Sequence, residues 1–162
     1  MANLTATTPL ALVQAVRSAV RAITPTMRPD LPWHLLDDEE HDSPVVVLST
    51  ADARKFAVWL DADTIQLHPQ GQGIYGAAGF STMVDVEIGV SYRSVRGQLA
   101  AMMIVADAVQ LKRACNVIQD PGTPGILLID NPGNPWRRAS RDGEQVYGVY
   151  SFRAHVMFTG GV

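Results

Sequence analysis

The strongest pattern in the chain is a strict alternation of apolar and polar or small residues from position 84 to position 92. The apolar positions are Val84, Val86, Ile88, Val90 and Tyr92, and the positions between them are Asp85, Glu87, Gly89 and Ser91. A period of two is typical of a β-strand with one buried face and one polar face. Residues 146–158 alternate in the same way near the end of the chain. We therefore expect two long strands in a mostly antiparallel sheet that is covered on one face.

Two other segments repeat apolar residues at helical spacing. The first begins at Pro9, where Thr8 provides an N-cap, and it ends at Pro25. The second follows Ser94 and extends to about residue 113. Its apolar stripe, which we expect to face the core, consists of Leu99, Met102, Met103, Ala106 and Val109. Both helices need an apolar surface to pack on, and the predicted sheet has one such face.

Three shorter apolar runs, at residues 45–48, 56–60 and 126–129, are further candidate strands. Long connections lie at residues 61–79, which include a possible short strand at 65–67, and at residues 119–145. The order helix, strands, helix, strands predicts an α+β fold. We expect a two-layer sandwich, in which two main helices pack on one face of a mostly antiparallel or mixed sheet of about four to five strands. The length of 162 residues fits a single domain.

Composition narrows the classes of function. The chain has 13 basic and 16 acidic residues, a net charge of −3, which argues against a general nucleic-acid binder because phosphate binding needs a basic surface. Cys115 is the only cysteine, so the chain cannot form an intramolecular disulfide or a cysteine-based zinc site, and a reducing compartment suits this count. We expect no signal peptide, because residues 1–8 are polar. We also expect no membrane span, because no stretch approaches about 18 apolar residues.

The sequence contains no strong chemical motif. Residues 71–76 match the G-x-G-x-x-G spacing of dinucleotide-binding turns, but the element predicted after them is a strand, which provides no helix N-terminus for a pyrophosphate. The acidic and histidine residues at 34–41 fit neither a zinc signature nor a calcium loop. The chain has no nucleophile-elbow serine, P-loop or His-Glu-x-x-His motif. We therefore predict no catalytic residue, no cofactor and no metal, and we expect that the protein is not an enzyme.

Two charged segments are the best candidates for interaction surfaces. Residues 30–42 contain six acidic residues and no lysine or arginine, and a basic cluster follows Trp136 in a proline-rich segment. Aromatic and arginine side chains are common anchors of protein interfaces. We predict that these segments contact another subunit or a partner protein. The predicted interface residues are Trp136, Arg137, Arg138, Arg141, Asp37, Asp38, Glu39 and Glu40.

The order of these elements resembles the tail terminator proteins of long-tailed phages, which are minor tail proteins of the kind that ends the lambda tail. The shared features are the helix from Pro9, a proline-rich stretch before residues 45–48, the alternating strand 84–92, the helix around 99–113, the segment Pro135-Trp136-Arg137-Arg138, the charged turn Arg141-Asp142-Gly143-Glu144 and a final strand at 149–158. The resemblance covers most of the chain as an order of elements. The loops at 61–79 and 119–145 have no clear counterpart, and they make the chain somewhat longer than the lambda kind.

This resemblance implies a virion protein that assembles in the host cytoplasm. Its copies would form a homohexameric ring at the head-proximal end of the tail tube, stop polymerisation of the tube and offer a surface for head joining. Its partners would be further copies of itself, the tail tube protein and the head completion or connector protein, while DNA passes through without specific binding. In such a ring Asp85 and Glu87 would face the lumen or the outer surface. Two alternatives stay open: a head–tail connector or neck subunit, and a small-molecule-binding α+β domain with its site under residues 61–79.

Overall fold

The centre of the structure is a pair of long antiparallel strands, β3 (Gly79–Arg93) and β6 (Gln145–Thr159), of 15 residues each. The computed structural model describes residues 7–35, 54–67, 79–93, 97–119, 122–131, 133, 135–142 and 145–159. The alternation in the sequence explains this pair. Val86 lies opposite Phe152 on the same buried face, and the polar residues between the apolar ones point to the other side.

Four further strands extend the sheet on both sides of this pair. They are β1 (Trp33–Leu35), β2 (Arg54–Leu67), β4 (Ile126–Asp130) and β5 (Trp136–Asp142). β2 pairs with β3, and β1 pairs in parallel with the first residues of β2. β4 pairs with residues 153–156 of β6, and β5 pairs with residues 145–150. The sheet is therefore mixed and mainly antiparallel, as predicted.

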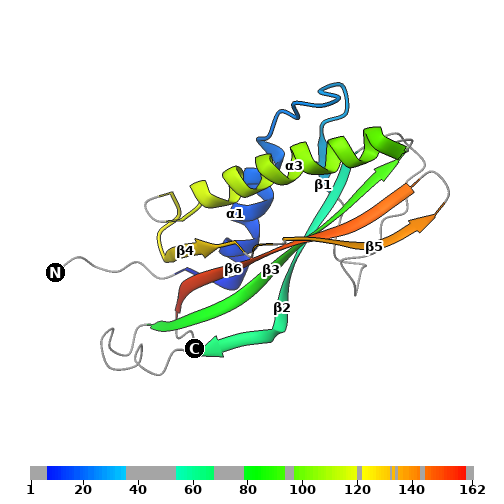
Figure 1. The fold of residues 1–162 in the computed structure, drawn as a ribbon. Coiled ribbons are helices and arrows are strands. Elements are labelled where there is room, and N and C mark those ends of the chain that lie inside the picture. The colour runs from blue at the N-terminus through cyan, green and yellow to red at the C-terminus, as the bar shows by residue number, and fades with distance from the viewer. Residues whose placement is uncertain are drawn as a thin grey trace.

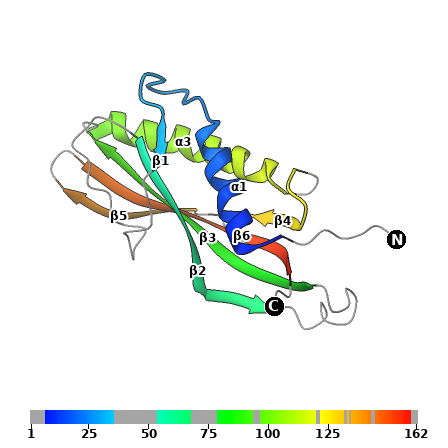
Figure 2. The same cartoon turned by 180° about the vertical axis from the view of Figure 1, so that it is seen from behind.

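Both helices, α1 (Pro9–Arg21) and α3 (Gly97–Val117), lie on one face of this sheet (Figure 1). The view from behind shows the same arrangement, with α1 crossing next to α3 (Figure 2). The predicted N-cap is present, because the Thr8 side chain accepts a hydrogen bond of 3.1 Å from the Ala11 backbone nitrogen. The predicted α+β fold, with two main helices on one face of the sheet, is confirmed.

The core fills the space between the helices and the covered face of the sheet. Its main residues are Leu12, Val16 and Val20 of α1, Phe56 and Val58 of β2, Val84 to Val90 at every second position of β3, Met103, Leu111 and Cys115 of α3, Ile126 and Ile129 of β4, and Phe152, Ala154 and Val156 of β6. The Cys115 side chain is buried among apolar groups, which raises the pKa of its thiol to about 12. The thiol therefore stays protonated and acts as a small apolar residue.

α3 does not bury the apolar stripe that the sequence indicated. Leu99, Met102 and Val109 were predicted to face the core, but they are between 43% and 50% exposed. The helix instead buries Met103, Ile104, Asp107, Leu111 and Cys115. Of the predicted stripe only Met103 is fully buried. The prediction was wrong because of Asp107. This charged residue lies in the middle of the face that α3 buries, so that face looked polar in the sequence, but inside the protein Asp107 is paired with Arg54.

The connections also differ from the prediction. β2 continues to Leu67, with a shift in its pairing to β3 after Asp61, so the short strand predicted near its end is part of β2. The predicted loop at 119–145 contains β5 in addition to β4. Sequence reasoning missed β1 because three residues are too few to show a period, and it missed β5 because arginines obscure the alternation. The predicted strand at 45–48 and the segment 71–76 lie outside the described residues.

Candidate functional site

A fully buried ion pair joins the sheet to α3. Arg54, the first residue of β2, and Asp107, in the middle of α3, are both completely excluded from solvent. The Arg54 Nε donates a hydrogen bond of 2.8 Å to Asp107 Oδ2. Burial raises the pKa of the Asp107 carboxyl, while the hydrogen bond from Arg54 opposes that shift. Desolvating two charges is costly, so such a pair is tolerated only where further hydrogen bonds complete it.

The remaining donors of Arg54 provide those bonds and hold the segment between α1 and β1. Its Nη1 donates to the backbone carbonyl oxygens of Arg28, at 2.8 Å, and Leu31, at 2.6 Å. Its Nη2 donates to the carbonyl oxygen of Met27. The guanidinium also lies 5.9 Å from the centre of the Trp33 ring, within the range of a cation–π contact. One buried side chain thus fixes β2, α3 and the α1–β1 connection, which is a structural role.

Trp136, which we predicted to be an interface anchor, packs against its own sheet. The side chain is half-buried, and its ring centre lies 4.7 Å from that of Tyr150 and 6.5 Å from that of Tyr92. The indole occupies the space above Gly148, because a Cβ atom at position 148 would overlap the six-membered part of the Trp136 ring. Glycine at this position of β6 therefore makes room for the indole.

We expect the change Gly148→Ala to destabilise the protein by about 1–3 kcal/mol, the usual cost of forcing a methyl group into a packed region. The new methyl group would displace the Trp136 indole from Tyr150. The same change should cost less in a Trp136→Leu background, where the overlapping ring atoms are absent. Urea unfolding of the four proteins measures both costs. Equal costs in the two backgrounds would show that the indole does not occupy this space.

The face of the sheet opposite to the helices carries a row of charges across four strands. The strand register places Asp61 of β2, Asp85 of β3, Arg153 of β6 and Asp130 of β4 next to one another. Arg153 Nε donates a hydrogen bond of 2.8 Å to Asp85 Oδ1. We call Asp61, Asp85 and Asp130 the acidic row. With three carboxylates around one guanidinium, this part of the sheet has a net charge of −2.

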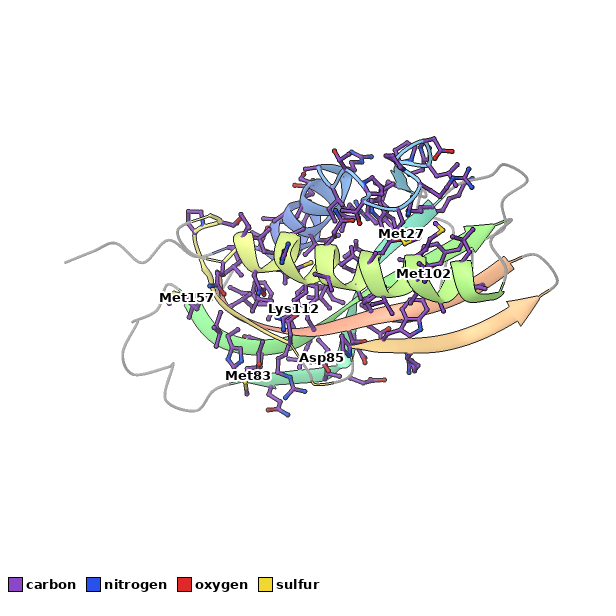
Figure 3. All side chains as sticks on the ribbon, turned by 45° about the horizontal axis from the view of Figure 1, so that its top comes forward. Met27, Met83, Asp85, Met102, Lys112 and Met157 are labelled. Atoms are coloured by element: carbon purple, nitrogen blue, oxygen red, sulfur yellow. The ribbon has the colours of Figure 1, made fainter. Side chains whose placement is uncertain are left out.

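An open depression of about 240 Å³ lies in the same place, and it is lined by Asp85, Asp130 and Arg153 together with Ser151 and Phe152. Figure 3 shows Asp85 and Met83 on this side of the sheet, away from α1 and α3. The depression is therefore a shallow, charged surface feature that a side chain of a partner can enter.

One predicted interface residue, Arg137, contacts Glu87, which was predicted to face the lumen or the outer surface. The Arg137 guanidinium, on the exposed side of β5, lies 3.3 Å from Glu87 Oε1 on β3. Burial raises the pKa of the Glu87 carboxyl, and the charge of Arg137 opposes that shift. Arg138 and Arg141 follow along the same strand, which pairs with β6. The acidic residues at 37–40 lie outside the described residues.

Part of the outer surface of the helix layer is apolar, although sequence reasoning assigned most of these residues to the core. Leu99, Met102, Val105 and Val109 lie three or four residues apart on one face of α3 and are 43% to 65% exposed. We call these four residues the α3 outer stripe. α1, the C-terminal part of α3 and the residues that follow it enclose an open groove of about 520 Å³, which is lined by four alanines together with Val117, Ile118 and other small or apolar residues.

Among the described residues, no group of three or more histidine, cysteine, aspartate or glutamate side chains is arranged to hold a metal ion. No helix in the described ranges is long and apolar enough to cross a membrane. No protein-family model matches the chain, and no curated protein has a sequence significantly similar to it. The candidate sites are therefore two exposed surfaces of different chemistry, the α3 outer stripe and the acidic row.

Proposed function

We propose that this protein is a structural subunit of a long-tailed phage, a tail terminator whose copies form a ring on the head-proximal end of the tail tube. The observation that carries the proposal is the α3 outer stripe, in which four large apolar side chains are exposed side by side. Exposed apolar patches typically mark contacts with another protein or a membrane. A ring subunit needs such a surface for its neighbour, and an enzyme working as a monomer does not.

The layered fold supports a ring as well. The helices form one outer face of the subunit and the polar side of the sheet forms the other (Figure 2). A subunit with two different outer faces can join its neighbours head to tail, and such contacts close into a ring when the rotation between copies permits. The order of α1, β3, α3 and the closing strands β5 and β6 agrees with the order on which the resemblance to tail terminators rests.

Electron microscopy tests this function directly. Negatively stained purified protein, alone and mixed with tail tubes, should show closed rings or caps at one end of each tube. Light scattering on the same sample should give the mass of an oligomer. Binding to the head completion protein without binding to tubes would favour the neck-subunit alternative. A rise in melting temperature with a small molecule, in a protein that forms no particles, would favour the ligand-binding alternative, because a ligand stabilises the native state to which it binds.

A charge reversal on β5 is the matching mutational prediction. We expect R137E/R138E/R141E to leave the subunit folded, because Arg137 is 65% exposed and forms only a surface ion pair. Attachment to tail tubes should be lost, since three positive charges on one strand become negative. The control R137K/R138K/R141K retains the charge and should assemble normally. Assembly of the reversed variant at the wild-type level would remove β5 from the interface.

A further inference from the structure

We propose that the α3 outer stripe docks on the open sheet face of a second copy of this chain, with Lys112 and Arg113 of α3 next to the acidic row. This inference rests on the proposed function, because it names the surfaces through which neighbouring subunits of the ring would meet. The contact is head to tail: every copy uses its helix layer towards one neighbour and its sheet towards the other.

The charges of the helix layer favour an acidic partner. α1 carries Arg17 and Arg21, and α3 carries Lys112 and Arg113. The only acidic residue in either helix is Asp107, which is fully buried in its pair with Arg54. The exposed ionic charge of the two helices is therefore positive. Two helix layers brought face to face would repel each other, which argues against a symmetric contact through α3.

The open sheet face has the complementary charge and a partly apolar surface. Its acidic row has a net charge of −2 including Arg153, and the depression between Asp85 and Asp130 can admit a lysine or arginine side chain. Next to the row, the register aligns Met83, His155 and Leu128, and the Leu128 side chain is 47% exposed. Figure 3 shows Met102 on α3 and Met83 on the far side of the sheet. A single subunit therefore cannot bring these two surfaces together.

The dimensions are also compatible. α3 has 21 residues and is about 30 Å long, while the 15-residue strands β3 and β6 are about 50 Å long. Ser91, Val149 and Met157 on this face are buried, so its accessible part runs from Met83 to Glu87 on β3 and from Ser151 to His155 on β6. This part is about 15 Å long, similar to the distance along α3 from Leu99 to Val109. Burial of the α3 outer stripe supplies the hydrophobic part of the contact, and the charges fix its orientation.

Two variants, each altered on one face only, test the inference. M102D/V105D places two carboxylates in the α3 outer stripe, and L128K/D130K places two positive charges on the sheet face and reverses the net charge of the acidic row with Arg153. All four positions are exposed, so both variants should fold as the wild type does, which circular dichroism and thermal melting check. In sedimentation velocity the wild type should associate as its concentration rises, and each variant alone should stay monomeric. An equimolar mixture of the two variants should form dimers, because each retains the face that the other lacks.

Leu10→Asp is the matched control, because Leu10 on α1 is 62% exposed and does not line the groove between α1 and α3. It should associate as the wild type does. Association of M102D/V105D at the wild-type level would overturn the proposed contact and leave the ring function standing. Monomers in the mixture would overturn the head-to-tail arrangement. Wild-type protein that stays monomeric at every concentration, but binds anionic lipid vesicles through the stripe, would overturn the contact in favour of a membrane surface. Absence of rings on tail tubes would remove the proposed function itself.

Discussion

Replacing Asp107 with leucine is expected to lower the free energy of unfolding by about 3–5 kcal/mol, although the new side chain is apolar and similar in size. The change leaves the Arg54 guanidinium buried without its carboxylate, and both side chains are completely excluded from solvent in the native protein. Domains of this size are stable by about 5–15 kcal/mol, so the loss is a large share of the total. Urea unfolding followed by circular dichroism measures it.

A double-mutant cycle separates the charge pair from the other bonds of Arg54. Arg54→Met alone should cost as much as Asp107→Leu or more, because it also removes the donor to the carbonyl oxygens of Met27, Arg28 and Leu31. The double variant R54M/D107L should recover part of the loss, since no unpaired charge remains buried. Asp30→Ala is the control, because the Arg28–Asp30 pair is exposed and such surface pairs contribute little to stability. Additive costs in R54M/D107L would refute the coupling.

The sequence was sufficient for elements whose signal is local. The alternation at 84–92 and at 146–158 predicted β3 and β6, because the polarity of each residue indicates which face of the strand it lies on. Thr8 and Pro9 predicted the start of α1 because capping needs only neighbouring residues. The fold class followed from the order of these elements, since an amphipathic helix and a half-polar sheet can bury their apolar faces only against each other.

The sequence was not sufficient where the position of a side chain depends on a residue far away in the chain. α3 carries two apolar faces, and the choice between them depends on Arg54, which lies 53 residues before Asp107 in the chain. The position of the Trp136 indole depends on a glycine in the next strand, and no pattern within β5 reveals it. The contact between Arg137 and Glu87 joins residues 50 positions apart. Neither candidate surface could therefore be predicted as a whole: the sequence pointed to Asp85 and Glu87, but it assigned most of the α3 outer stripe to the core.

The wrong prediction for the buried face of α3 bears on the proposed function. The sequence-predicted stripe is strongly apolar, and the structure leaves most of it exposed, because the core takes the face that contains Asp107. A helix that is apolar on both faces is expected in a subunit that packs inside an assembly. The buried ion pair thus selects which face of α3 meets the sheet and which face remains available to a partner.

Replacing Val86 with aspartate is expected to unfold the domain at neutral pH. Val86 is completely buried on the covered face of β3, opposite Phe152. The change removes the burial of a valine, about 1.5–3 kcal/mol, and adds an unpaired carboxylate, whose desolvation costs several kcal/mol more. Ile88→Asp, two positions along on the same face, should have the same effect.

The stability of these variants should depend on pH. Burial raises the pKa of an unpaired carboxyl, so the native state binds its proton more tightly than the unfolded state does. The variants should therefore regain stability as the pH falls towards the ordinary pKa of aspartate, and lose it as the pH rises. Met83→Asp on the half-buried, opposite face of the same strand is the control and should remain folded at pH 7. A soluble V86D variant with the wild-type melting temperature at pH 7 would mean that β3 presents its other face to the helices.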